Sequence, residues 1–578
     1  MSPQSGTDRR ASVGWWLQGA ALVFVLACIG GLVILGAQAY FRHDDAQILL
    51  WATSFKGNVF SVFSFDPAVN LWGTGAFAGM AGYYRPVSYF LILLLVRAFG
   101  VNAPVLMGLA AAAMGLALAA YGIVARRLTG YQTALLALTL FFVAYGQVLY
   151  QAFRLGVPYG YLLEFGALAL LIVATRRRNW LLWVAGVVVF IAACLTRQSA
   201  IVLVPAVVLV ADMAAARRGG ERSLTGPVSP MSLYLAILGL AVLLVGFGGA
   251  SSGAASNLSV AWVLERVVFY AGVALGGVRA PILVAPIIYA GIRLMLSRGL
   301  ASRASWQRLL VSAMAACVVA ATVAVLPAWG LLAVLMAMTA ASVTEPALRV
   351  PAVWFLVGFG FYVIPGFYHQ AYLLEALLGL ALFAAQCWRL VVRDVEAELK
   401  SRRARLSSDI RRNASRLAGA TVVLALLGLF IWGRPLLLVA SAQEAVTGFV
   451  QSNDATSRAA RETAREAPLD STVLMFSDRQ RQATPERWRD QSLSYRASQV
   501  RVFDNADMQA MIGALGRTDV IVAEYGAPVA VLDQSRPMLA FVFSEDERIE
   551  MARDWRIAGV VDFSVGHSFL QLLRLERP

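Results

Sequence analysis

Long apolar runs separated by short polar segments dominate the first 440 residues of this 578-residue chain. A helix needs roughly 20 mostly apolar residues to cross a hydrocarbon core about 30 Å thick. The pattern therefore predicts a polytopic α-helical membrane protein with thirteen spans, several of them short. They are expected at residues 15–40, 103–125, 132–150, 157–175, 180–196, 199–214, 231–250, 277–296, 308–327, 329–343, 351–365, 370–391 and 417–440. Residues 85–98 are interpreted as a juxtamembrane or re-entrant helix that does not span, although a span there is the alternative.

The pattern changes after about residue 440. Residues 441–578 are polar and charged, with short apolar runs at 472–476, 500–503, 520–523, 538–543 and 559–563. A helical pattern at 507–515 lies between two of these runs. Short strand-like runs alternating with helical stretches are typical of an α/β fold. The sequence thus predicts a transmembrane domain at residues 1–440 and a small α/β domain at 441–578.

The composition indicates that lipid surrounds most of the chain. Hydrophobic residues make up 59% of the sequence and charged residues only 14%, whereas soluble proteins carry roughly 25% charge. One large soluble core does not explain this, because single cores stop growing at roughly 250–300 residues.

The positive charge predicts the orientation of the chain. The formal net charge is +15, and basic residues cluster between the apolar runs, as expected of cytoplasmic loops. With thirteen spans, every basic loop falls on the same side as the N-terminus. We therefore expect a multi-pass protein of the cytoplasmic (inner) membrane, with a cytoplasmic N-terminus and an extracytoplasmic α/β domain. The basic segment 393–416 fits contact with anionic lipid headgroups, and nucleic acid is not expected as a partner because no aromatic residues are interleaved there.

An acidic pair follows the first predicted span, in the segment 41–45 (Phe-Arg-His-Asp-Asp). Two carboxylates at a membrane boundary are costly to desolvate, so Asp44 and Asp45 suggest a catalytic base, a bound cation or a metal site. A divalent ion such as Mg²⁺ or Mn²⁺ fits carboxylate ligands, although two carboxylates alone do not make a metal cage. The alternative is a solvated loop that caps a helix, because Asp is a favoured N-cap residue.

A second signal lies at residues 82–89 (Gly-Tyr-Tyr-Arg-Pro-Val-Ser-Tyr). Pro86 can occupy the first turn of a helix without losing a hydrogen bond. Arg85, beside Tyr84, would then face the outer loop and could bind a phosphate group. The alternative is interfacial anchoring, since tyrosines and long basic side chains are common at that depth.

The order of these signals resembles the GT-C superfamily of glycosyltransferases, in particular bacterial relatives of protein O-mannosyltransferases and lipid A aminoarabinose transferases. Residues 195–200 (Leu-Thr-Arg-Gln-Ser-Ala), followed by Pro205, are similar to the family's Lys-Glu-Ser-Ala stretch, with Arg for Lys and Gln for Glu. Residues 372–375 (Tyr-Leu-Leu-Glu), preceded by His369, are similar to its Arg-Tyr-Leu stretch, with Ala371 in place of Arg. The resemblance covers roughly residues 15–395.

The resemblance implies an enzyme that transfers a sugar, with inversion, from a polyprenyl-phosphate donor to an extracytoplasmic protein, lipid or glycan acceptor. Asp44 or Asp45 would accept the acceptor's proton or position the acceptor. The donor phosphate needs cations, and the basic side chains expected on the outer face are Arg85, Arg154, Arg197 and His369. Each of these could instead be an interfacial residue.

Glu164 is a further candidate for substrate binding, because an acid two turns into the predicted span 157–175 seldom faces lipid. The resemblance implies that it orients substrate or binds metal. Alternatively, it pairs internally with an arginine, either Arg154 or one on another helix.

Two other functions remain open at this point. A transporter or flippase of lipid-linked glycans would often show internal repeats, and the sequence shows none. A non-catalytic membrane scaffold would not need Asp44, Asp45, Arg85 and Glu164.

Overall fold

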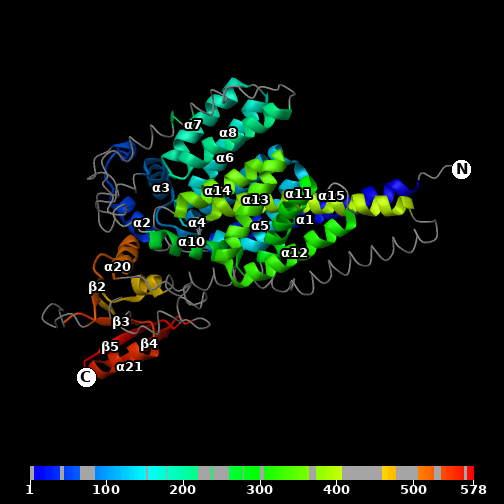
Figure 1. The fold of residues 1–578 in the computed structure, drawn as a ribbon. Coiled ribbons are helices and arrows are strands. Elements are labelled where there is room, and N and C mark those ends of the chain that lie inside the picture. The colour runs from blue at the N-terminus through cyan, green and yellow to red at the C-terminus, as the bar shows by residue number, and fades with distance from the viewer. Residues whose placement is uncertain are drawn as a thin grey trace.

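The computed structural model consists of a large helical bundle and a smaller unit with a β-sheet (Figure 1). It describes residues 5–38, 44–64, 85–151, 154–177, 179–218, 235, 237–238, 260–276, 279–299, 305–363, 373–405, 459–476, 505–525, 535–564 and 569–577.

The helices of the bundle follow the apolar runs of the sequence. In chain order they are α1 (Ser5–Gln38), α2 (Asp44–Ser54), η1 (Val59–Phe63), α3 (Pro86–Phe99), α4 (Ala103–Thr129), α5 (Tyr131–Gln151), α6 (Val157–Arg177), α7 (Trp180–Cys194), α8 (Ala200–Arg218), α10 (Val260–Leu275), η6 (Ala280–Val284), α11 (Ala285–Gly299), α12 (Ser305–Val325), α13 (Pro327–Thr344), η7 (Pro346–Leu348), α14 (Arg349–Val363) and α15 (Leu374–Arg405).

Five helices among the described residues are long and apolar enough to cross a membrane. These segments are Gln18–Ala37, Ala103–Thr129, Val157–Thr175, Pro327–Thr344 and Leu374–Ala397. Shorter apolar helices occupy most of the other predicted spans. The 14-residue helix α3 forms at the segment that was interpreted as not spanning, and whether it spans stays open. The predicted span 417–440 lies outside the described residues, as does nearly all of 231–250. The chain is thus mostly helical, and the number of thirteen spans stays a prediction.

Polar and small residues set the helix ends. Asn102 and Asn179 precede α4 and α7, and their side-chain oxygens accept hydrogen bonds from backbone N–H groups of the first turn. Gly100 and Gly130 follow α3 and α4 with φ angles of +63° and +93°. Glycine adopts this backbone conformation without the strain that a side chain would add.

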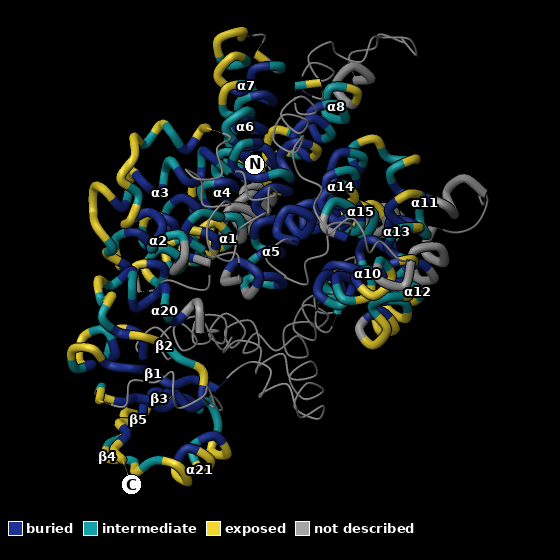
Figure 2. Tube along the Cα trace, turned by 90° about the vertical axis from the view of Figure 1, so that its left-hand side faces the viewer, coloured by how far each residue is buried: buried dark blue, intermediate teal, exposed yellow. Residues whose placement is uncertain are grey.

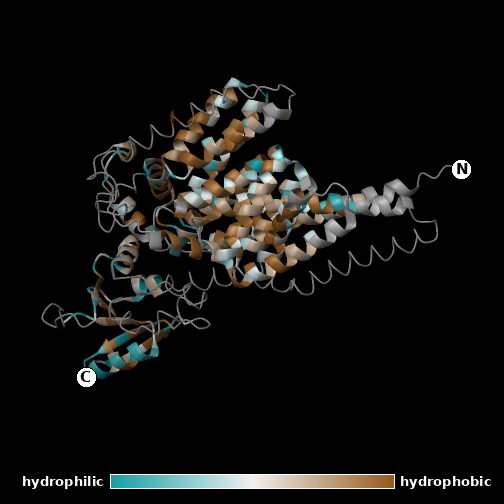
Figure 3. Ribbon diagram, in the orientation of Figure 1, coloured by the Kyte–Doolittle hydropathy of each residue, from teal (hydrophilic) through white to brown (hydrophobic). Residues whose placement is uncertain are grey.

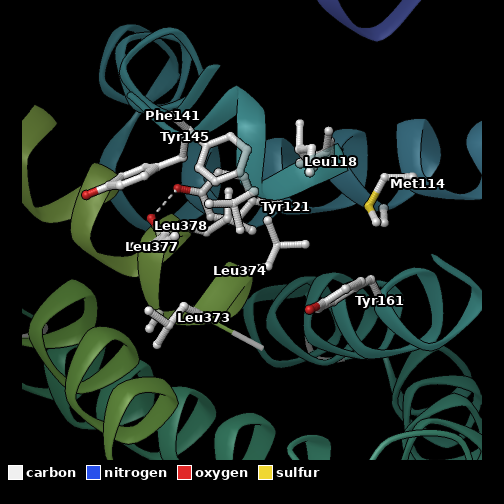
Figure 4. Close-up of a cluster of buried hydrophobic side chains, with 14 of the residues drawn as sticks. Met114, Leu118, Tyr121, Phe141, Tyr145, Tyr161, Leu373, Leu374, Leu377 and Leu378 are labelled. Carbon is white, nitrogen blue, oxygen red and sulfur yellow. Dashed lines mark hydrogen bonds between the residues drawn. The ribbon is translucent and has the colours of Figure 1, made fainter. Parts of the chain in front are cut away.

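The core of the bundle surrounds the first half of α15. Residues from Leu374 to Ala385 on this helix are almost all completely buried. Small residues let backbones approach closely: a Cβ added at Gly379 would lie 2.7 Å from the backbone nitrogen of Phe355 in α14. The Tyr121 hydroxyl of α4 donates a hydrogen bond of 2.9 Å to the carbonyl oxygen of Leu378 (Figure 4). Hydrophobic residues prevail over the described helices of the bundle (Figure 3).

The C-terminal unit contains a five-stranded sheet. Its elements are β1 (Thr472–Met475), α20 (Asn505–Ala514), β2 (Ile521–Glu524), β3 (Met538–Val542), α21 (Glu545–Asp554), β4 (Arg556–Asp562) and β5 (Gln571–Glu576). The strand order is β2-β1-β3-β5-β4; β1 pairs in parallel with β2 and β3, and β5 pairs antiparallel with β3 and β4. Four of the short apolar runs lie at β1 to β4, the run 500–503 lies outside the described residues, and β5 was not predicted.

The sheet unit docks on the bundle through α20, which lies against α2 (Figures 1 and 2). Buried residues of α2, including Leu49 and Trp51, belong to the same continuous apolar cluster as Met508 and Ile512 of α20. The other face of the sheet packs separately, around Met551 of α21. Because α2 and α20 touch, the segment after α1 and the C-terminal unit lie side by side.

Candidate functional site

Asp45 lies at the start of α2 and is almost completely buried, with 1% of its surface exposed. Its Oδ1 accepts a hydrogen bond of 2.9 Å from the backbone N–H of Leu155. Leu155 belongs to the short connection between α5 and α6 and directly follows Arg154. The carboxylate therefore joins two segments that are far apart in the sequence, and it is oriented by a backbone donor.

The start of α3 meets the same connection. A Cβ added at Gly156 would lie 2.7 Å from Ser88 Oγ, so the loop and α3 are in close contact there. Ser88 lies in the first turn of α3, and Arg85 is the N-cap residue of that helix. The structure therefore gathers Asp45, Arg154 and the helix start that carries Arg85 at one end of the bundle. Both arginines are partly exposed there.

A second cluster of charged residues lies inside the bundle. Arg197, in the turn between α7 and α8, forms an ion pair of 2.8 Å through Nη2 with Glu375 Oε1 of α15. Its Nε lies 3.8 Å from Glu164 Oε2 of α6. The Ser199 hydroxyl donates a 2.8 Å hydrogen bond to the same Glu375 oxygen. Both glutamates are completely buried, and Arg197 is 8% exposed.

The face of α6 is shaped to receive the Arg197 side chain. Its guanidinium carbon lies 3.9 Å from the ring centroid of Tyr161, which is a cation–π contact. A Cβ added at Gly160 would lie 2.5 Å from both Cγ and Cδ of Arg197. Only glycine at position 160 leaves room for the Arg197 side chain to pack against this part of α6. The cluster as a whole ties α6, α15 and the α7–α8 turn together.

The predicted site residues are thus divided between two places. Asp45, Arg85 and Arg154 belong to the end of the bundle, whereas Glu164 and Arg197 belong to the buried cluster. The Arg197 side chain points inward between two carboxylates, and its expected place on the outer face stays a prediction.

Three of the predicted residues have no described side chain. Tyr84 and His369 lie outside the described residues, and for Asp44 the structure describes only the backbone, as the first residue of α2. Their predicted roles therefore remain predictions.

Glu375 is the main residue that the sequence prediction missed. It lies within the quoted segment 372–375, but only the tyrosine and leucines of that segment were compared with the family motif. The signal available was the same as for Glu164, namely an acid inside a long apolar run.

An internal ion pair with Arg154 or with an arginine elsewhere was the alternative expectation for Glu164. The structure places Arg197, in the turn between α7 and α8, within ion-pair distance of it. This pairing does not exclude a role in binding substrate, which stays a prediction.

The described residues include no group of three or more His, Cys, Asp or Glu side chains that could hold a metal ion. A carboxylate pair at Asp44 and Asp45 would need further ligands to form such a site. The divalent metal beside Asp44 and Asp45 therefore stays a prediction.

Comparisons with known proteins find similarity only among solved structures: no protein-family profile and no curated protein matches the chain. The crystal structure of ArnT from Cupriavidus metallidurans bound to undecaprenyl phosphate is 14% identical, over 96% of this chain and 98% of that chain, with a TM-score of 0.40. Its apo state is 15% identical over 98% of both chains, with a TM-score of 0.41. Both similarities extend over nearly the whole of this chain.

Proposed function

We propose that this chain is a membrane glycosyltransferase that transfers a sugar, with inversion, from a polyprenyl-phosphate donor to an extracytoplasmic acceptor. The observation that carries the proposal is the placement of Asp45. This carboxylate is buried at the end of the bundle, is oriented by the N–H of Leu155, and has Arg154 as the next residue of the same connection. The order of the sequence motifs supports the same function.

Asp45 is proposed as the general base. An acceptor hydroxyl or amine must lose a proton as it attacks the anomeric carbon, and a carboxylate within hydrogen-bond reach can accept that proton. The Leu155 N–H fixes one carboxylate oxygen, so the group does not need to reorganise during the reaction. Asp44 is the alternative base, since it precedes Asp45 in the same turn of α2.

Arg85 and Arg154 are proposed to bind the donor phosphate. The leaving group is a lipid phosphate, and guanidinium groups bind phosphate through paired, charge-assisted hydrogen bonds. Both side chains are partly exposed at the end of the bundle where Asp45 lies. Tyr84 and His369 are included in the proposal as further donor contacts, and a divalent metal beside Asp44 would neutralise phosphate charge.

Arg197 has a different role in this proposal. Its guanidinium already contacts Glu375 and Glu164 inside the bundle. We assign it to positioning α6, which follows the connection that holds Asp45. Glu164 would then influence substrate binding through the position of this helix.

The test is the Asp45→Asn variant. An Asn side chain retains an oxygen acceptor for the Leu155 N–H but cannot act as a base, so the local structure should survive. We expect kcat to fall roughly 10²–10⁴-fold, the range for loss of a general base. Release of free polyprenyl phosphate from a panel of polyprenyl-phosphate sugars, in proteoliposomes, measures the reaction whichever sugar is used.

Glu265→Gln provides the matched control, because Glu265 is exposed on α10 and the change is again a carboxylate to an amide. Wild-type rates in both Asp45→Asn and Asp44→Asn would remove the base assignment. Movement of intact donor lipid across the bilayer, without release of polyprenyl phosphate, would instead favour a flippase.

A further inference from the structure

The helix that carries Asp45 is held between the bundle and the C-terminal sheet unit. On the bundle side, the Trp51 ring of α2 lies 5.5 Å from the ring of Tyr89 in α3, measured between centroids. On the other side, α2 packs against α20. Leu50 and Trp51 are adjacent on a helix with 3.6 residues per turn, so their side chains leave it in different directions.

The contact between α2 and α20 is close because Gly513 has no side chain. A Cβ at Gly513 would lie 3.2 Å from Leu50 Cδ1. Glycine inside a helix destabilises it by roughly 0.5–1 kcal/mol relative to alanine. In α20 the missing side chain leaves room for Leu50.

The contact is also part of the apolar core. Leu49 of α2 and Met508 and Ile512 of α20 are completely buried and belong to one continuous apolar cluster. Helices of about this length are marginal alone in water, and α2 has only 11 residues. Its position must therefore come from the elements packed around it.

The sheet fixes α20 in turn. The Gln509 side chain of α20 donates a 2.8 Å hydrogen bond to Val520 O and accepts one from Val522 N in β2. These two bonds attach the helix to the edge strand of the sheet. A continuous series of contacts thus leads from the sheet through α20 and α2 to Asp45.

We propose that the C-terminal unit positions the acid-bearing helix α2, and that Leu50 and Gly513 are positioning residues for the transfer reaction. This inference rests on the proposed function, in which Asp45 is the base. A shift of about 1 Å at a reacting group can lower a rate about 10²-fold. Removing or displacing the unit should therefore affect catalysis without any contact between the unit and the substrate.

The test introduces bulk at the contact and then removes it again. In Gly513→Leu, the new side chain should displace Leu50 and loosen α2. We expect faster hydrogen exchange of backbone amides in residues 44–54 of the full-length protein in nanodiscs. We also expect kcat to fall by roughly 10–100-fold, with the KM for the donor lipid unchanged. Leu50→Ala in the same chain should restore both quantities most of the way.

Gly559→Leu is the matched control. A Cβ at Gly559, on β4, meets only Arg574 Cβ at an ordinary distance of 3.7 Å, so exchange in α2 and kcat should stay at wild-type values. If Gly513→Leu fails to fold, Gly513→Ala supplies a smaller perturbation, for which the same changes are expected at reduced size.

Two results for Gly513→Leu would overturn the inference. One is hydrogen exchange in α2 at the wild-type rate, and the other is faster exchange in α2 with an unchanged kcat. Failure to be rescued by Leu50→Ala would also count against it, because the size of the side chains would then not be the cause. If the wild-type protein releases no polyprenyl phosphate, the proposed function fails, and the exchange measurement alone decides whether the unit holds α2.

Discussion

Arg197 has two acidic partners, and it lies closer to one of them than to the other. Glu375 contacts its Nη2 at 2.8 Å and also accepts the Ser199 hydrogen bond, whereas Glu164 lies 3.8 Å from its Nε. Removing one partner of a buried ion pair is destabilising because the remaining charge loses its compensation. The closer and better hydrogen-bonded acid should therefore matter more for stability.

We predict that Glu375→Ala destabilises the protein by about 3–5 kcal/mol, the range for breaking a buried pair. Glu164→Ala should cost less, because Arg197 keeps its shorter contact with Glu375. Thermal unfolding of both variants in the same detergent measures the difference. Equal losses, or a larger loss for Glu164→Ala, would contradict the ranking that the two distances indicate.

Single residues were predictable from the sequence, but their pairing was not. Glu164 stands out because charged residues are rare inside apolar runs, and Asp45 and Arg197 stand out because they lie at the boundaries of such runs. The partnership of Arg197 depends on the inward direction of the α7–α8 turn and on the space at Gly160. Neither feature produces a hydrophobic pattern along the chain, so the sequence offered no way to choose among the arginines.

At the scale of elements, Arg517 connects the parts of the C-terminal unit. It donates 3.0 Å hydrogen bonds to the carbonyl oxygens of Ala464 and Ala467, at the end of the helical residues 459–466. It also forms an ion pair of 2.7 Å with Asp519, just before β2. The hydrogen bond from Arg517 lowers the pKa of the Asp519 carboxyl below its ordinary range.

This lowered pKa predicts acid sensitivity of the C-terminal unit. Below pH about 4 the unfolded chain binds a proton at Asp519 before the folded chain does, so stability falls as the pH falls. The contribution is fully present at neutral pH. In Asp519→Asn the unit should be less stable at pH 7, and its stability should decline less between pH 5 and pH 3. Hydrogen exchange of β1 and β2 across this pH range measures both effects, and an equally steep decline in the variant would contradict them.

Helices were more predictable than strands for a physical reason. A helix that crosses lipid needs a long run of apolar residues, which is visible in the sequence. The helices α4, α6 and α15 coincide with such runs. The strand β5 was missed because its sequence, Gln-Leu-Leu-Arg-Leu-Glu, mixes polar residues into a short run. Its burial comes from pairing between β3 and β4, which the local sequence does not reveal.

At the scale of the whole molecule, the docking of α20 on α2 constrains the topology. The segment that follows α1 and the C-terminal unit must share one side of the membrane, whatever the number of spans between them. The charge pattern predicts that this is the extracytoplasmic side.

A reporter active only outside the cytoplasm tests this orientation. We predict that a phosphatase fused after Ser441 is active and that one fused after Arg127 is inactive, because the arginines at 126–127 should lie in the cytoplasm. Activity in the Arg127 fusion, with none in the Ser441 fusion, would invert the proposed arrangement and place Asp45 on the cytoplasmic face.

The docking itself could not be predicted from the sequence. The apolar residues of α20 look like those of any helix that packs on a sheet, and nothing in their spacing indicates that some of them contact a distant helix. The contact brings together segments from near the two ends of the chain, and only the folded structure reveals such a pairing.

This separation has a consequence for biosynthesis. The ribosome makes α2 well before α20, so the acid-bearing helix lacks this contact until the segment Asn505–Ala514 has been synthesised. A chain that terminates early could still insert its helices into the bilayer, but it would lack the element that steadies the acid. If Asp45 is the base, as proposed, newly made protein would therefore stay inactive until α20 has been made and has docked on α2.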